Sequence, residues 1–199
     1  MGDPKVFGLG FQKTGTSSLE AMLRRLGYDE ILSYHQFRDM AQTEGLTLED
    51  IKARAMDLVQ TCDAAKDTPW PLFYRELDAA FPGAKFIHVI RNRDAWIKSA
   101  VGDFAHWPNM IHQAIYGTPC PQGYEEIWLE RYDRHNAEVA AYFEGRPDDY
   151  LQLNLEEGLT YDRICPFLGK PVLQEAIPQA NTRGEARLRR LKSRLGLGG

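Results

Sequence analysis

A glycine-bearing loop near the start of the chain constrains the fold more than any other feature. The apolar residues 5–9 predict a strand and residues 17–26 predict a helix, and between them lies the loop Gly10-Phe11-Gln12-Lys13-Thr14-Gly15-Thr16-Ser17. Its two glycines have the separation of a P-loop, but Thr16 stands where a P-loop has lysine, and the lysine has moved forward to Lys13. A P-loop lysine reaches the terminal phosphates of a nucleoside triphosphate, and the hydroxyl that follows it holds Mg²⁺. The loop therefore predicts an anion site of another kind.

This loop has two other interpretations. A dinucleotide-binding turn needs a third glycine at the position of Lys13, so that fingerprint fails. A plain structural turn needs no cluster of polar residues, whereas Lys13, Thr14, Thr16, Ser17 and Ser18 crowd this one at the start of a helix. Because backbone amides at a helix N-terminus attract anions, we favour a site for a phosphorylated ligand.

Residues 12–19 resemble the 5′-phosphosulfate loop of sulfotransferases that use 3′-phosphoadenosine 5′-phosphosulfate (PAPS). The family usually has proline where this chain has Gln12. The resemblance implies that Lys13 neutralises charge on the bridging and leaving oxygens and is catalytic. It also implies that the loop binds the cofactor through Gln12, Lys13, Thr14, Gly15, Thr16 and Ser17.

A second segment agrees with this resemblance. The apolar residues 86–90 predict a buried parallel strand, and Arg91 stands at the strand end, where ligands bind in such folds. In the sulfotransferases an arginine at this place and a serine eight residues later bind the 3′-phosphate, and Arg91 and Ser99 match that spacing. The alternatives are a surface ion pair of Arg91 with Asp94 and a solvated position for Ser99.

The C-terminal part is similar to the sulfotransferase ending in the order of its pieces: a strand over residues 150–154, an acidic residue and glycine, a helix ending in Phe-Leu-Gly, and Pro-x-x-Asn at residues 178–181. Arg183, just beyond, is expected near the cofactor. Residues 183–199 predict a basic helix or tail that closes over the 3′-phosphate, binds a partner or is simply solvated.

For the catalytic base we favour Asp67, because one sulfotransferase branch has an Asp-x-Pro that faces the acceptor, and Pro69 follows here at that spacing. A turn acid that caps the next helix is the alternative. Residues 103–122, rich in aromatic side chains, form either a lid over the acceptor pocket or a closure of the core. His88 is expected to be a hydrogen-bonded core residue, and the other candidate bases are His35, His106 and His112.

Composition fits one α/β domain over residues 1–199. The chain is 43% hydrophobic and 26% charged, with a net charge of −4 that argues against nucleic acid as a partner. Three separated cysteines indicate neither a zinc site nor a disulfide framework, and the default location is the cytoplasm. No segment reaches membrane-spanning length, so we expect no membrane partner and a likeness to the small soluble bacterial-type branch of the family.

Taken together, the sequence predicts a single-domain, P-loop-like three-layer sandwich with a central parallel sheet flanked by helices. Further helices are expected from residue 47, over residues 72–81 and over residues 125–143, and further strands over residues 31–34, 62–65 and 150–153. The predicted function is transfer of a sulfuryl group from PAPS to the hydroxyl of a small alcohol or phenol, with no metal required. The alternatives are a P-loop kinase acting on a nucleotide or small molecule, disfavoured by the displaced lysine, and a noncatalytic sensor of the desulfated nucleotide PAP. The oligomeric state is not predicted.

Overall fold

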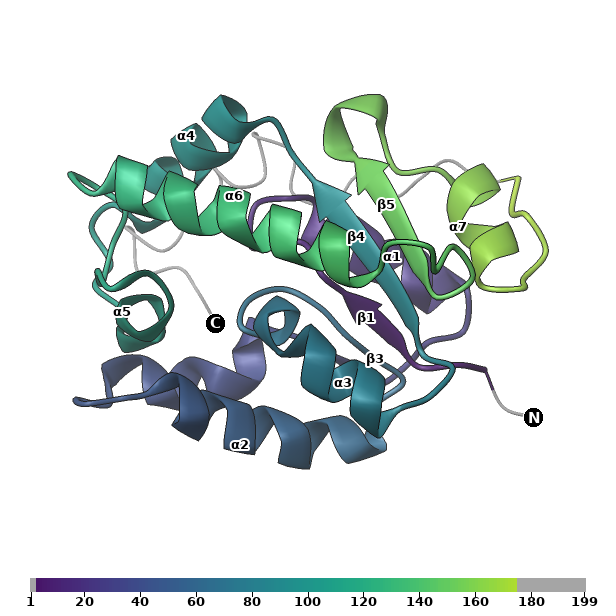
Figure 1. The fold of residues 1–199 in the computed structure, drawn as a ribbon, viewed down its shortest axis with the longest axis horizontal. Helices are drawn as coiled ribbons and strands as arrows, with labels where there is room; N and C mark the ends of the chain where they lie inside the picture. Colours follow the sequence, from purple (N-terminus) through teal and green to yellow (C-terminus); the bar gives the residue numbers. More distant parts are fainter. Residues whose placement is uncertain (1–2, 175–199) are drawn as a thin grey trace, which may run out of the picture.

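A central parallel sheet organises the computed structural model, which describes residues 3–174. Five strands lie in the order β2-β3-β1-β4-β5, and every neighbouring pair is parallel (Figure 1). The strands are β1 (Val6–Gly8), β2 (Ile31–Leu32), β3 (Ala64–Ala65), β4 (Lys85–Ile90) and β5 (Tyr150–Asn154). Because parallel strands present their carboxyl ends at one edge, the loops after β1, β3 and β4 are brought together there.

Helices cover both faces of this sheet. The α-helices are α1 (Thr16–Arg25), α2 (Leu48–Leu58), α3 (Tyr74–Ala80), α4 (Arg93–Phe104), α5 (Met110–Tyr116), α6 (Glu125–Tyr142) and α7 (Tyr161–Phe167). The 3₁₀ segments of the described residues are η1 (Tyr34–Gln42), η2 (Val59–Thr61), η3 (Trp70–Phe73) and η4 (Leu155–Glu157).

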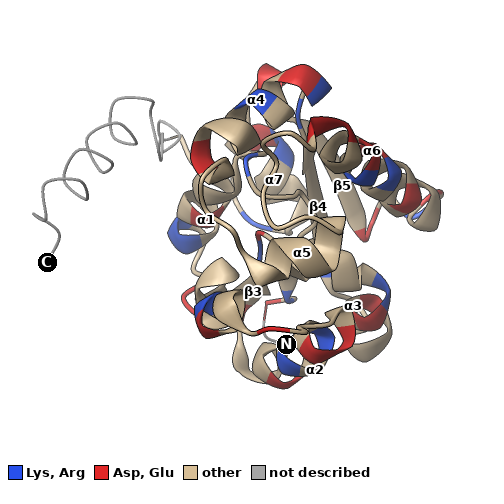
Figure 2. Ribbon diagram, turned by 90° about the vertical axis from the view of Figure 1, so that its left-hand side faces the viewer, with Lys and Arg blue, Asp and Glu red and all other residues tan. Residues whose placement is uncertain are grey.

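The sheet separates two hydrophobic cores, and alternate residues of its strands belong to one or the other. Val6 and Ile87 pack against α1 and α7, whereas their neighbours Phe7 and Phe86 pack against the larger group formed by α2 to α6. Successive side chains of a strand point to opposite faces, so one sheet supports both cores. The predicted three-layer α/β architecture with a central parallel sheet is confirmed (Figures 1 and 2).

Two predicted elements differ from the structure in their bounds. The strand predicted over residues 31–34 ends at Leu32, because Ser33 caps η1 by accepting a hydrogen bond from the His35 amide at 3.3 Å. The helix predicted over residues 72–81 begins at Trp70 as the 3₁₀ segment η3 and becomes α-helical only at Tyr74. The helix expected from residue 47 is α2, and Thr47 caps it: the Thr47 hydroxyl accepts from the Asp50 amide at 3.2 Å.

Several sequence predictions fall outside residues 3–174. These are Arg183, the basic segment 183–199 and the Pro-x-x-Asn at residues 178–181. Among the helices of the described part, none is both long enough and apolar enough to cross a bilayer. Within the same residues, no group of three or more His, Cys, Asp or Glu side chains is arranged to hold a metal ion.

Candidate active site

The loop between β1 and α1 is held tightly against the end of β4. A Cβ atom on Gly10 would lie 2.3 Å from the Thr14 hydroxyl and 2.4 Å from the Val89 carbonyl oxygen, so only glycine fits there. Lys13 and Gly15 have left-handed backbone angles, φ 71° and 90°, which turn the loop into the first turn of α1. The first amides of a helix have no partner within it, and the first turn of α1 carries no acidic residue. The loop therefore presents the positive end of a helix to a ligand.

Gln12 is a buried structural link in this loop. Its amide donates to the Thr68 hydroxyl at 3.2 Å, and the Thr68 hydroxyl donates to its Oε1. Its Nε2 donates to the Tyr116 hydroxyl at 2.7 Å, and its carbonyl accepts from the Trp96 indole at 2.8 Å. Proline has no N–H, so the residue usual in the family could not make the first of these bonds. Gln12 thus ties the loop to the segment after β3 and to α4 and α5.

Arg91 joins the end of β4 to the same loop. Its guanidinium donates to the Lys13 carbonyl oxygen at 2.9 Å, and its backbone is fixed by Tyr132, whose hydroxyl accepts from the Arg91 amide at 2.8 Å and donates to its carbonyl at 2.9 Å. The suggested ion pair with Asp94 is absent from the described residues. Ser99 lies half-buried on α4, and no hydrogen bond within residues 3–174 joins it to Arg91.

The Lys13 ammonium forms a salt bridge with Asp103 on α4, and both side chains are 27% exposed. Asp103 also lines the adjoining pocket, so Lys13 stands at the boundary between the loop and that pocket. The two residues are ninety positions apart in the sequence. The structure therefore brings the lysine of the glycine loop to the wall of this pocket.

Asp67 occupies a turn after β3, with φ 71°. Its Oδ1 accepts from the Thr68 amide at 2.9 Å. Burial raises the pKa of the Asp67 carboxyl, and the nearby charges of Lys66 and Lys13 oppose that rise. Aspartate tolerates a left-handed backbone better than most residues do. A carboxylate with a raised pKa at a cavity wall is a chemically competent proton acceptor.

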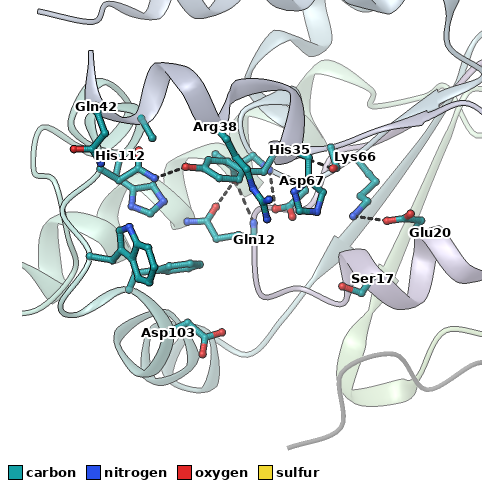
Figure 3. A pocket seen from close by; sticks show the side chains of 17 residues that line it. Gln12, Ser17, Glu20, His35, Arg38, Gln42, Lys66, Asp67, Asp103 and His112 are labelled. Atoms are coloured by element: carbon teal, nitrogen blue, oxygen red, sulfur yellow. Dashed lines mark hydrogen bonds and ion pairs between the residues drawn. The ribbon is translucent and has the colours of Figure 1, made fainter. Parts of the chain in front are cut away.

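A cavity of about 740 Å³ opens beside Asp67 at the carboxyl edge of the sheet (Figure 3). This volume suits a drug-sized ligand. Its walls come from the glycine loop and α1, from η1, from the turn after β3, and from the segment joining α4 to α5. The lining residues are Gln12, Ser17, Glu20, Ser33, Tyr34, His35, Arg38, Ala41, Gln42, Lys66, Asp67, Thr68, Asp103, Phe104, Trp107, Asn109 and His112.

The histidines separate clearly. His35 and His112 line the cavity, whereas His106 lies exposed in the turn after α4. The prediction for His88 is confirmed: it is fully buried, with Nδ1 2.8 Å from the Tyr150 hydroxyl and Nε2 3.0 Å from Asn136 Oδ1. Burial lowers the pKa of His88 and of His112 to about 4, so both rings are neutral near pH 7.

The comparison with protein families decides the class of this chain. Residues 5–111 and 100–186 match the family described as the sulfotransferase domain, which covers more than half of the sequence. The chain belongs to this sulfotransferase family. Membership supports a sulfotransferase activity, and the resemblance drawn from the three sequence segments is confirmed at the level of the family.

Individual relatives of this sulfotransferase are distant. Ava biosynthesis cluster protein M of Aspergillus versicolor is 28% identical over 218 positions, which cover 89% of this chain and 81% of that protein. A sulfotransferase from Alicyclobacillus acidocaldarius is similar in structure with a TM-score of 0.52 at 20% identity, over 100% of this chain and 98% of that one. A mouse sulfotransferase in complex with PAP gives a TM-score of 0.49 at 16% identity, over 96% of this chain and 64% of that one. The Alicyclobacillus likeness shows a shared fold.

Four charged residues that line the cavity are not among the site residues predicted from the sequence. Lys66 and Glu20 form an ion pair of 2.8 Å in the cavity wall, and Asp103 holds Lys13. Lys66 directly precedes Asp67, which was a usable signal. Arg38 also lines the cavity, but it lies in a 3₁₀ segment that no motif marks, so the sequence held no sign of it.

Proposed function

We propose that this sulfotransferase transfers a sulfuryl group from PAPS to the hydroxyl group of a small-molecule acceptor, an alcohol or a phenol. When bound, PAPS supplies a sulfuryl group activated by its attachment to a 5′-phosphate. One observation carries the proposal: the hydrogen bond from Arg91 to the Lys13 carbonyl makes the end of β4 and the glycine loop one continuous edge beside the cavity that contains Asp67.

The side chains along this edge suit a ligand with two anionic groups. We assign the 5′ end of the donor to Lys13 and to the first amides of α1, with Gly15, Thr16 and Ser17 at the helix start. Arg91 offers a guanidinium fork to the 3′-phosphate. Ser99, two turns into α4, is the second 3′-phosphate residue in this assignment, and Arg183 keeps its place as a proposed contact outside the described residues.

Two loop residues are assigned a shaping role. The Thr14 hydroxyl donates to the Phe11 carbonyl at 2.7 Å, and its amide donates to the same oxygen at 3.3 Å. The side chain of Gln12 is likewise engaged by Thr68 and Tyr116. Because their polar groups are already bonded within the protein, we propose that Gln12 and Thr14 fix the shape of the cradle while their neighbours contact the donor.

The acceptor is proposed to lie in the 740 Å³ cavity with its hydroxyl toward Asp67. The carboxylate then takes the hydroxyl proton as the new O–S bond forms and the bond between sulfur and the 5′-phosphate oxygen breaks, so that PAP leaves. Lys13 stabilises negative charge on the leaving phosphate, which requires its ammonium to turn from Asp103 toward the donor. Positioning and charge stabilisation by the chain's own residues supply most of the rate in such a transfer. No step in this scheme calls on a metal ion.

Residues 103–122 are proposed to serve both as a cavity wall and as part of the core. Phe104 and Trp107 line the cavity, and Trp107 is 69% exposed at its rim. By contrast, Ile111 and Ile115 of α5 are buried in the larger core. We propose that α5 anchors this segment while the residues before it cover the acceptor.

Calorimetric titration with PAP, and separately with ATP and Mg²⁺, tests the donor site. The wild type is expected to bind PAP, and Arg91→Ala is expected to weaken binding by roughly 10- to 100-fold, the usual effect of losing charge-assisted hydrogen bonds. Arg93→Ala is the matched control, because Arg93 lies exposed and pairs with Asp133 and Glu126 on the surface. A preference for Mg-ATP with no response to PAP would contradict the proposal.

Transfer itself is tested with ³⁵S-labelled PAPS and a panel of alcohols and phenols. Lys13→Ala is expected to bind PAP yet lose turnover, whereas a noncatalytic PAP sensor shows no turnover in either protein. Because Arg91 also holds the loop, thermal unfolding of Arg91→Ala must accompany the titration. A folded variant with weakened PAP binding separates ligand recognition from loss of structure.

A further inference from the structure

The charged residues of the acceptor cavity are not all matched by partners of opposite sign. Glu20 pairs with Lys66 at 2.8 Å, and Asp103 pairs with Lys13. Asp67 is the proposed base and must stay available to the acceptor hydroxyl. Within residues 3–174, these pairings leave Arg38 as the Lys or Arg side chain of the lining that has no carboxylate partner.

Arg38 lies on η1 and is exposed to the cavity. No hydrogen bond or ion pair joins it to any other residue in the described part of the chain. The adjacent acid, Asp39, is engaged by Arg54 at 2.6 Å and so is not its partner. A guanidinium presents five N–H donors in a planar fork that matches a carboxylate, sulfate or phosphate. Arg38 therefore offers a recognition group that residues 3–174 do not use.

The position of Arg38 suits an acceptor that spans the cavity. Figure 3 shows Arg38 and His35 leaving η1 toward the pocket that contains Asp67. Burial is the main cause that lowers the pKa of His35, and the positive charge of Arg38 lowers it further, which is consistent with two neighbouring side chains. Phe104 and Trp107 supply an apolar wall on another side. The cavity thus combines a fork for an anion, an apolar wall and a proton acceptor.

Electrostatics gives this cation a function. The chain has a net charge of −4, and acidic and basic residues alternate over α2 and α6 (Figure 2). An anionic acceptor gains no help from the overall field, and it must enter a cavity that already holds Asp67. A local, unpaired guanidinium is the group that offsets this repulsion at short range.

We infer that the acceptor carries an acidic group, a carboxylate or a sulfate or phosphate ester, which binds Arg38 while the acceptor hydroxyl faces Asp67. This inference rests on the proposed function, because it assigns the cavity to the acceptor. Arg38 is accordingly a specificity residue, and its loss raises the KM for acidic acceptors more than it lowers kcat.

The test uses matched pairs of small molecules with the full-length protein saturated with PAP. One kind of pair is a hydroxylated aromatic or aliphatic acid and its neutral amide. The other kind is a phosphate or sulfate monoester of a diol and the monomethyl ether of the same diol, so that both members keep one free hydroxyl. Binding is measured by calorimetry for the wild type, for Arg38→Met and for Arg134→Met. Met keeps the apolar stem of arginine, and Arg134 is an exposed arginine of α6 outside the cavity lining.

The wild type is expected to bind at least one acid about 10- to 100-fold more tightly than its neutral partner. Arg38→Met should abolish that preference and leave PAP affinity unchanged, whereas Arg134→Met should retain it. Neutral members that bind as well as the acids, a preference that survives Arg38→Met, or no binding by any acid of the panel would overturn the inference.

The same proteins separate this inference from the proposed function. If ³⁵S-labelled PAPS is turned over with neutral acceptors only, and Arg38→Met does not change the rate, the proposed function is retained. The inference that the acceptor carries an acidic group is then overturned. An acid preference that depends on Arg38 in a protein that neither binds PAP nor transfers a sulfuryl group retains the recognition by Arg38 and overturns the function.

Discussion

The link between Gln12 and Thr68 yields the sharpest energetic prediction. Thr68 is 2% exposed and Gln12 is 6% exposed, so the two bonds between them are shielded from water. Thr68→Val keeps the shape of the side chain but removes its hydroxyl. The backbone N–H of Gln12 and its side-chain Oε1 then both lose their hydrogen-bond partner in a buried position.

A buried polar group left without its hydrogen bond costs about 1–3 kcal/mol, so Thr68→Val should lower the free energy of unfolding by about 3 kcal/mol. In a Gln12→Leu background Oε1 is already gone, and only the amide is orphaned by the second change. The cost of Thr68→Val should then fall to about 1.5 kcal/mol. The difference is a coupling energy of about 1.5 kcal/mol between two residues 56 positions apart.

Urea denaturation of the wild type, both single variants and the double variant measures this cycle. For a chain of this length, Thr68→Val should also lower Tm by roughly 6–12 °C. Thr160→Val is the control, because the Thr160 hydroxyl makes no capping hydrogen bond at α7, and it should change stability by less than about 0.5 kcal/mol. Equal costs of Thr68→Val in both backgrounds would refute the link.

Three further predictions concern the site and its support. Burial raises the pKa of Asp67, so its negative charge destabilises the folded state at pH values above that pKa. Asp67→Asn should therefore unfold at a higher urea concentration at pH 7, while the rate of sulfuryl transfer falls by about 100-fold or more. A variant that is less stable but fully active would contradict this prediction. Gly10→Ala should destabilise the protein by about 1–3 kcal/mol and weaken PAP binding, because its Cβ meets the Val89 carbonyl, whereas Gly102→Ala in open space on α4 should be neutral or stabilising in the same assays. The pKa of His88 is lowered to about 4 in the folded protein, so the unfolded chain binds the proton at higher pH. The free energy of unfolding should therefore fall by about 3 kcal/mol from pH 6.5 to 4, and His88→Gln should reduce this fall. The same pH dependence of stability in His88→Gln would count against a lowered pKa of His88.

The donor side of the site was predictable because local patterns encode it. The glycine loop and Arg91 each follow an apolar strand, and parallel strands deliver such loops to one edge. What the sequence did not reveal was that β1 and β4 are neighbours, which sets Arg91 against Lys13. Strand order depends on packing between distant segments, and no periodicity records it.

The acceptor side was less predictable for a physical reason. Asp67 was found through a motif, whereas the partner of Lys13 lies ninety residues away on α4 and leaves no local trace. Arg38 sits in a 3₁₀ segment, which has three residues per turn, so the 3.6-residue repeat of an α-helix does not mark its position. Gln12, which stands where the family usually has proline, has a structural role as well. Its backbone N–H donates a hydrogen bond that proline cannot make, but this role becomes evident only once the position of Thr68 is known.

The cavity walls and the donor cradle arise from different parts of the chain. The cradle is built on β1, β4 and α1, which also form the sheet and its cores, whereas η1 and the connection between α4 and α5 supply much of the acceptor wall. Segments that carry few of the sheet contacts tolerate exchange better than the sheet does. Grafting residues 34–42 from another member of the family is therefore a practical route to retarget this enzyme, because new acceptors could be selected without rebuilding the part that is proposed to hold the activated donor.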